Sequence, residues 1–191
     1  MIQNQDEHQR RSIRLKEYDY SQAGAYFVTI CTCKKECAFG DIVDGEMVLN
    51  KYGKVAQEEW LRTTDIRPSV ELDEFIIMPN HMHGIVVIVE SNVGATGRSP
   101  LPKGPIPKSV GAMLAGFKSA VTKRINELRG TPYKPVWQRN YYEHVIRNED
   151  DLNEIREYIA NNPLKWDLDK ENPNNVAVTC GSPHGEVTSS L

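Results

Sequence analysis

The sequence predicts an α+β fold in which helices pack on one face of an antiparallel β-sheet. Strand-like segments follow one another along the chain, turn residues separate them, and segments with helical periodicity lie between these groups. Consecutive strands joined by short turns pair antiparallel, and a sheet buries its apolar face under helices. We therefore expect a layered arrangement of one sheet and its helices.

The expected strands are rich in β-branched and aromatic residues. Ala25 to Cys33, AYFVTICTC, is a candidate buried strand. In AFGDIVDGEMVLN, the Asp44-Gly45 pair separates two apolar runs and predicts a hairpin. VELDEFIIM and HMHGIVVIVE flank Pro79-Asn80, which predicts two antiparallel strands joined tightly.

Three segments have the periodicity of helices. Lys51 to Thr63 has apolar residues near helical spacing and ends before Pro68. Ser109 to Arg129 has an apolar stripe with most basic residues away from it, which predicts an amphipathic basic helix. Asn148 is expected to cap the last helix, EDDLNEIREYIANN, and Pro163 to end it.

The chain of 191 residues is long enough for one domain with its own core. We expect that domain at 1–170, including a basic N-terminal segment, and a disordered tail at 171–191 that lacks periodicity. The segment 91–108 is rich in Gly and Pro and is expected to be a mobile loop. No stretch approaches the ~18 apolar residues of a membrane span, and the N-terminus lacks the apolar core of a signal peptide. We therefore expect a soluble, cytoplasmic protein without membrane partners and with reduced thiols.

The net charge of −3 hides a strong segregation of charge along the chain. From Lys103 to Arg147 there are nine basic and two acidic residues, whereas Glu36 to Glu90 has four basic and eleven acidic ones. The basic part offers a surface for an anion such as nucleic acid. A solvated helix face would have the same pattern.

Two histidines one residue apart, His81 and His83, directly follow a Met-Pro-Asn turn. Alternate side chains of a strand share a face, so the two imidazoles can converge on one ion from Cα atoms ~6.5 Å apart. Met82 between them would face the core. Two ligands seldom make a metal site, and strand histidines are often merely satisfied or exposed, so the motif alone leaves both interpretations open.

The last expected helix offers further groups for such a site. Tyr158 and Asn162 are four residues apart, so a helix places them on one face. If this helix crosses the histidine strand, Asn162 can complete a set of three ligands and Tyr158 lies beside the metal. A phenol next to a divalent ion suits phosphodiester cleavage, because the ion offsets charge that develops in the transition state. A half-buried packing tyrosine is the alternative interpretation.

Three segments follow one another along the chain: RRSIRLKEYDYSQAGAYFVTICT, MPNHMHGIVVI and YYEHVIRNEDDLNEIREYIANNPLKW. The occurrence of all three in this order is more specific to one protein family than any single segment is. They resemble the N-terminal signature, the HUH strand and the tyrosine helix of the REP-associated tyrosine transposases, a branch of the single-tyrosine HUH transposases of bacterial insertion sequences. The resemblance extends from about Arg10 to Trp166. It implies the ferredoxin-like, RRM-like sandwich of HUH endonucleases.

The resemblance also implies roles for individual residues. His81 and His83 match metal ligands, Tyr158 matches the nucleophile, and Asn162 matches the third ligand, where related insertion-sequence enzymes have glutamine. The implied cofactor is a divalent metal, Mg2+ or Mn2+. The implied substrate is single-stranded DNA folded into hairpins, the repetitive extragenic palindromes, which is cut through a 5'-phosphotyrosine and then transferred. The implied state is a monomer or a homodimer.

The expected DNA contacts form three groups. The basic N-terminal residues resemble the family's segment that recognises a tetranucleotide beside the hairpin. Basic residues of the amphipathic helix can neutralise phosphates, and side chains of VWQRNYY can contact unpaired nucleotides, although surface packing could explain each one. In order, the groups are Arg10, Arg11, Arg14 and Lys16; Lys118, Lys123, Arg124 and Arg129; and Trp137, Arg139, Tyr141 and Tyr142.

Several alternatives remain. Tyr141 and Tyr142 are rival nucleophiles, but they precede the helix and lack a partner at helical spacing. Cys31, Cys33 and Cys37 could hold a structural zinc, yet no fourth ligand is evident, which favours core thiols. A non-cleaving DNA-hairpin-binding protein and a metal-dependent phosphoesterase that uses activated water are the two rival functions.

Overall fold

The computed structural model describes residues 22–89 and 109–174. The predicted N-terminal DNA contacts, the predicted loop at 91–108 and residues 175–191 of the predicted tail lie outside these ranges. Residues 171–174 lie inside them, and Asn172 is buried and donates a hydrogen bond to the carbonyl of Trp166. The described fold therefore continues past the predicted boundary at 170. Within the described ranges, no helix combines the length and apolar character needed to cross a membrane.

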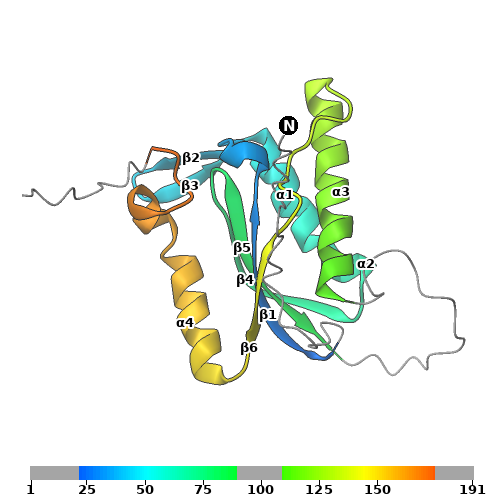
Figure 1. The fold of residues 1–191 in the computed structure, drawn as a ribbon, viewed down its shortest axis with the longest axis vertical. Coiled ribbons are helices and arrows are strands. Elements are labelled where there is room, and N and C mark those ends of the chain that lie inside the picture. Colours follow the sequence, from blue (N-terminus) through cyan, green and yellow to red (C-terminus); the bar gives the residue numbers. More distant parts are fainter. Residues whose placement is uncertain (1–21, 90–108, 175–191) are drawn as a thin grey trace, which may run out of the picture.

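A four-stranded antiparallel sheet lies at the centre of the fold (Figure 1). Its strands, in spatial order, are β4 (Val70–Ile77), β5 (His81–Ile88), β1 (Gly24–Cys31) and β6 (Tyr142–Ile146). The two central strands pair over their whole length, from Gly24 opposite Ile88 to Cys31 opposite His81. The predicted α+β class with an antiparallel sheet is confirmed.

A separate hairpin joins β2 (Gly40–Val43) to β3 (Glu46–Leu49). Its two turn residues, Asp44 and Gly45, have φ values of 52° and 79°. A two-residue turn with positive φ at both positions matches the twist of the flanking strands, and Asp-Gly tolerates it well. The hairpin predicted from this dipeptide is confirmed.

Helices cover both faces of the sheet, so the prediction of helices on one face is wrong (Figure 1). On one face, α1 (Lys51–Leu61) and α3 (Val110–Arg129) pack against alternate residues of β1 such as Tyr26 and Val28. On the other face, Ile159 of α4 (Glu149–Ala160) packs against Phe27 and Ile85. The central strands are apolar on both sides, and each side needs its own cover. The short helices are α2 (Thr63–Ile66) and the 3-10 helices η1 (Cys33–Lys35) and η2 (Pro163–Leu168).

Capping residues mark the ends of two helices, and one of them, Asn148, was predicted. The Asn148 side chain accepts a hydrogen bond from the amide of Asp151 and starts α4, as predicted. The Ser109 side chain accepts from the amide of Ala112 at the start of α3, and Gly130 ends that helix with a φ of 62°. Local sequence therefore sets where the helices begin and end.

Strand β6 was not predicted. It is only five residues long and contains Glu143 and His144, so it lacks the apolar character of a buried strand. It pairs with β1 from Ala25 opposite Ile146 to Thr29 opposite Tyr142. β6 forms because it pairs with β1, and this pairing places Tyr142 and His144 on the face of the sheet that α4 covers.

Candidate metal and nucleophile site

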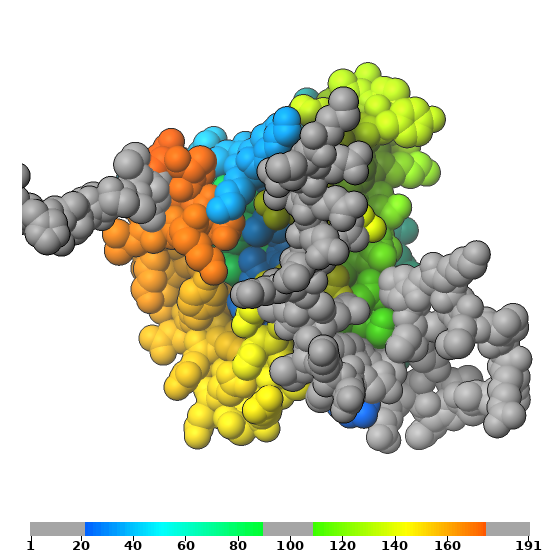
Figure 2. Space-filling view, in the orientation of Figure 1, coloured from blue at the N-terminus to red at the C-terminus, as the bar shows by residue number. Residues whose placement is uncertain are grey.

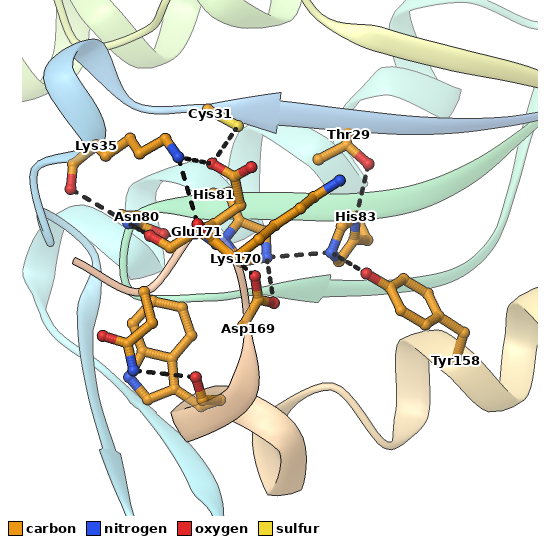
Figure 3. Close-up of polar contacts among 12 residues, drawn as sticks. Thr29, Cys31, Lys35, Asn80, His81, His83, Tyr158, Asp169, Lys170 and Glu171 are labelled. Atoms are coloured by element: carbon orange, nitrogen blue, oxygen red, sulfur yellow. Dashed lines mark hydrogen bonds and ion pairs between the residues drawn. The ribbon is translucent and has the colours of Figure 1, made fainter. Parts of the chain in front are cut away.

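The candidate site lies on the face of the sheet that α4 covers. Strand β5 supplies His81 and His83, β1 supplies Thr29, α4 supplies Tyr158, and the segment after η2 supplies Asp169 (Figure 3). The register sets His83 opposite Thr29 and His81 opposite Cys31. In the space-filling view, atoms of β1 are visible between the segment after α4, in orange, and β6, in yellow (Figure 2).

The two histidines meet at their Nε2 atoms, which are 3.1 Å apart. Both side chains are buried, with exposed fractions of 0% for His81 and 4% for His83. Two ligand atoms ~2.1 Å from an ion and at right angles to one another are ~3.0 Å apart. The spacing of the two Nε2 atoms therefore fits ligation of a single cation, as strand alternation predicted.

The outer nitrogens of the rings are held by polar side chains. Thr29 Oγ1 lies 2.8 Å from His83 Nδ1, and Asn80 Oδ1 lies 2.9 Å from His81 Nδ1. Such contacts fix ring orientation in metal sites and turn the other nitrogen toward the ion. The sequence did not identify either residue as part of the site.

Asp169 is a third residue that the sequence did not identify as part of the site. Its Oδ2 atom lies 3.9 Å from His81 Nε2, and the ligand atoms of His81, His83 and Asp169 all lie within 4.8 Å of one another. Asp169 follows η2, where the chain has lost helical periodicity. No spacing rule in the sequence connects it to the histidines.

Asn162 lies where the sequence predicted, near Tyr158 and the histidines, although α4 ends at Ala160. Its backbone keeps helical angles, with φ −61° and ψ −42°, so its side chain stays in phase with the helix. The side chain is 2% exposed, and its Oδ1 makes no hydrogen bond of good geometry among the described residues, while the amide is close enough to His81 to raise the pKa of that imidazole. Buried acceptors are rarely left unpaired, so this oxygen fits a site that receives a cation.

The electrostatics favour neutral imidazoles. Burial lowers the pKa of His81, although Asp169, Glu171 and Asn162 oppose the shift. Burial, followed by the charge of His81, lowers the pKa of His83 well below its usual value. A neutral imidazole is the form that binds a metal.

Tyr158 projects from α4 toward His83. Its hydroxyl lies 3.3 Å from His83 Nε2, and its ring contacts Phe27 and His83 at centroid distances of 6.1 and 5.2 Å. Burial raises the pKa of the Tyr158 hydroxyl, with a further contribution from Asp169. The residue is nevertheless 41% exposed, so a substrate can approach it. Tyr158 is thus a protonated phenol that needs activation.

Strand β6 brings one rival tyrosine to the same face. Tyr142 is 43% exposed, and its ring lies 6.3 Å from that of Phe27. Tyr141 instead packs against the core on the opposite face. Among the described residues, only Tyr158 of the three tyrosines has a hydroxyl contact to a histidine of the site in the structure.

Trp137, one of the residues predicted to contact unpaired nucleotides, lies in the core. It is 6% exposed and packs between Phe39 and Phe117, at centroid distances of 5.0 and 5.6 Å. Both rings belong to the main core. A nucleotide cannot reach Trp137 without disrupting that core.

Three of the four basic helix residues hold other parts of the chain. Lys118 donates to the carbonyls of Gln138 and Arg139, and Arg129 donates to Asn126 and to the carbonyl of Lys134. Arg124 forms ion pairs with Glu58 and Glu59 of α1. By contrast, Lys123 and Arg139 are exposed. The described part of α3 is therefore less available to phosphate than its composition predicted.

The described cysteines are free thiols outside the metal-ligand group. Cys31 Sγ lies 3.6 Å from Glu171 Oε2, and burial raises its pKa to about 11. Cys33 and Cys37 are also free. In the described ranges, the only group of three His, Cys, Asp or Glu ligands is the one with the two histidines and Asp169.

No family model matches the chain. A protein of Haemophilus influenzae whose function is uncharacterized is 42% identical over 169 residues, which cover 85% of this chain and 93% of that protein. A second Haemophilus influenzae protein, assigned as a candidate REP-associated tyrosine transposase, is 22% identical over 151 residues, covering 77% of this chain and 74% of that protein.

A solved structure supplies the fold comparison. The structure of a REP-associated tyrosine transposase bound to a REP hairpin superposes with a TM-score of 0.52 at 21% identity. The match covers 79% of this chain and 74% of that chain. The two proteins share their fold, and the sequence similarity to this kind of transposase is distant.

Proposed function

We propose that this chain, which belongs to the same family as the uncharacterized Haemophilus influenzae protein, is a metal-dependent endonuclease and strand transferase for single-stranded DNA. One observation carries the proposal: a tyrosine hydroxyl lies 3.3 Å from one of two buried histidine nitrogens that are themselves 3.1 Å apart. A nucleophile beside a cation site suits phosphoryl transfer.

The proposed cation is Mg2+ or Mn2+. His81 and His83 would hold it through Nε2, and Asn162 and Asp169 would provide oxygen ligands. Imidazole, amide and carboxylate ligands together suit such divalent ions. When bound, the ion would polarise a phosphoryl oxygen of the substrate and offset negative charge in the transition state.

Tyr158 is the proposed nucleophile. Its phenol oxygen would form a bond to phosphorus while the bond from phosphorus to the 3' oxygen breaks, which gives a 5'-phosphotyrosine and a free 3'-hydroxyl. The phenol must lose its proton for this step, and its exposed side lets the proton pass to solvent, while the departing 3' oxygen takes up a proton from solvent. Because the phosphotyrosine conserves the bond energy, a 3'-hydroxyl can reverse the step and transfer the strand.

The proposed substrate is DNA that folds into palindromic hairpins. The distant relative whose structure is known was solved with a REP hairpin, and this chain shares its fold. Tyr142 is exposed on β6, next to Thr29 of the candidate site, and Arg139 is exposed on the segment that leads into β6. A cation and an exposed aromatic ring can contact the phosphate and base of an unpaired nucleotide.

Cleavage and adduct formation test the proposal. Labelled single-stranded palindromic DNA with Mn2+ or Mg2+ should yield a covalent protein–DNA adduct with the wild-type chain and none with Tyr158→Phe. Tyr142→Phe is the matched control, because it removes a hydroxyl from the same face of the sheet and should leave the adduct intact. An adduct of wild-type strength from Tyr158→Phe would refute the assigned nucleophile.

A double variant separates chemistry from binding. His81→Ala with His83→Ala should abolish cleavage and largely retain hairpin binding at moderate salt, because the histidines act at the cut and not along the stem. Cleavage without any adduct would indicate a phosphoesterase that uses water. Hairpin binding without cleavage by the wild-type chain would indicate a non-cleaving DNA-binding protein.

A further inference from the structure

Asn80, the residue between Pro79 and His81, is buried at 1% exposure and connects three parts of the chain. Its Nδ2 donates to the carbonyl of Glu171 at 2.6 Å and to the carbonyl of Lys35 at 3.2 Å, and its Oδ1 lies 2.9 Å from His81 Nδ1 (Figure 3). The sequence identified Asn80 only as a turn residue. Three polar contacts by one buried amide exceed what a turn requires.

These contacts fix the direction in which the amide faces. A carbonyl oxygen only accepts hydrogen bonds, so the two carbonyls of Lys35 and Glu171 require the amino end of Asn80 on their side. The oxygen end must then face His81, and a neutral His81 must carry its proton on Nδ1 to donate to it. Nε2 of His81 is left as an unprotonated acceptor on the side of His83 and Asp169.

The same amide is attached to the turn that presents Asp169. Within that turn, the amide of Glu171 donates to Asp169 Oδ1 at 2.7 Å, and the amide of Asn172 donates to the Asp169 carbonyl at 3.0 Å. The bond from Asn80 to the Glu171 carbonyl fastens this turn to the start of β5. Thr29, by comparison, contacts His83 alone among the ligand residues.

We infer that Asn80 is a positioning residue with two tasks: it holds His81 in the Nδ1-protonated tautomer, and it fastens the turn that carries Asp169. The metal-binding consequence rests on the proposed function, whereas both positioning tasks exist in the metal-free protein. Residues in such outer positions typically change metal affinity by about 10- to 100-fold when mutated.

The tautomer is tested without metal. Long-range 1H–15N correlation spectra of the full chain distinguish a protonated from an unprotonated ring nitrogen, with His81→Gln used to assign the signal. In mildly alkaline buffer the wild type should show His81 protonated on Nδ1, and Asn80→Ala should show a mixture of tautomers. Asn80→Asp keeps the size of the side chain and an acceptor for Nδ1, so it should retain the wild-type tautomer.

The second task is tested by amide hydrogen exchange at residues 169–172. Both Asn80→Ala and Asn80→Asp lose the donated bonds to Lys35 and Glu171, so exchange in this segment should accelerate in both. Asn172→Ala is the matched control: it removes the bond from Asn172 to the Trp166 carbonyl and loosens the same segment without contacting His81. It should speed exchange and leave the tautomer unchanged.

Mn2+ titration then measures the consequence for the site. Asn80→Ala should bind Mn2+ about 10- to 100-fold more weakly than wild type, with circular dichroism confirming that it is folded. A wild-type tautomer together with wild-type exchange in Asn80→Ala would overturn the inference. If the wild type binds no Mn2+, the proposed function fails, and the spectra and exchange rates still decide the role of Asn80.

Discussion

The oxygen ligands of the candidate site should decide how tightly its two buried imidazoles hold a cation. His81 and His83 supply no charge, because burial lowers the pKa of both. Asp169 supplies negative charge, and Asn162 supplies a buried amide oxygen that makes no hydrogen bond of good geometry in the described structure. The affinity of the site for a divalent ion should therefore depend strongly on Asp169.

Asp169→Asn is the variant that tests this dependence. It should weaken Mn2+ binding by at least about 10-fold, since even outer-shell substitutions have effects of that size. Asp167→Asn is the matched control, because Asp167 is exposed on η2 and does not belong to the ligand group. Calorimetric titration of both variants checks the expectation, and equal Mn2+ affinity in Asp169→Asn and wild type would exclude Asp169 as a ligand.

The residues of the site differ in how far the sequence could predict them. His81 and His83 share a face because strand side chains alternate, and Tyr158 and Asn162 approach one another because helical geometry repeats. Asp169 and Asn80 obey no such period. Their positions depend on how η2 turns the chain back over the start of β5, which only the folded structure determines.

At the scale of elements, the placement of Tyr158 depends on how α4 is attached to the sheet. Arg156 donates two hydrogen bonds to Asp73 of β4, at 2.9 and 2.6 Å. Asp73 lies where the register of β4 shifts between Leu72 and Phe75. This bidentate ion pair connects the helix that bears the nucleophile to an edge strand.

Acid should weaken this attachment. The hydrogen bond from Arg156 holds the pKa of Asp73 below its ordinary value. The unfolded chain therefore binds a proton at Asp73 more readily than the folded chain, so the stabilisation is present at neutral pH and is lost as pH falls through the lowered pKa, below about 4.

Arg156→Gln should accordingly lower the thermal unfolding temperature slightly at neutral pH, and its difference from wild type should shrink in acid. Lys54→Gln removes one positive charge from an exposed position of α1 and should show no such convergence. Thermal melts at neutral pH and at a series of acidic pH values below ~4 make the comparison, because the contribution of the ion pair is lost only as pH falls through the lowered pKa of Asp73. A difference that stays constant with pH would show that the ion pair is not its cause.

The elements themselves were predictable where local patterns determine them. Asp44-Gly45 forces a hairpin, and Asn148 starts α4, because turn and cap chemistry act within a few residues. Strand β6 and the second helical layer were missed for a different reason. Glu143 and His144 interrupt the apolar pattern of β6, and strands that are apolar on both faces do not reveal which helix covers which face.

At the scale of the whole molecule, the acidic and basic segments of the chain stabilise the fold, and the basic segment also offers positive charge to a ligand. The acidic and basic parts of the chain meet where Arg124 of α3 pairs with Glu58 and Glu59 of α1. The Glu59 side chain is 4% exposed, so it needs a cation next to it. Arg139, by contrast, is exposed before β6 and is available to a phosphate.

These two arginines should therefore respond differently to the same substitution. Arg139→Gln should weaken binding of hairpin DNA and reduce the slope of log affinity against log salt by about 0.7 to 0.9, the value of one phosphate contact. Arg124→Gln should instead lower the unfolding temperature, because among the described residues it leaves the buried carboxylate of Glu59 with only Arg62 as a cationic partner. Its salt slope should stay close to that of wild type.

Lys123→Gln completes the comparison, since Lys123 is exposed on α3 one residue before Arg124. Because α3 lies on the face of the sheet opposite the candidate site, a loss of salt slope in Lys123→Gln would mean that the hairpin stem extends around the molecule to α3. An unchanged slope in Lys123→Gln with a reduced slope in Arg139→Gln would place the DNA on the segment before β6 and away from the exposed side of α3. Filter binding across a salt series and thermal melts of all three variants decide between these arrangements. In Arg124→Gln, a reduced salt slope with an unchanged unfolding temperature would refute the structural role assigned to that ion pair.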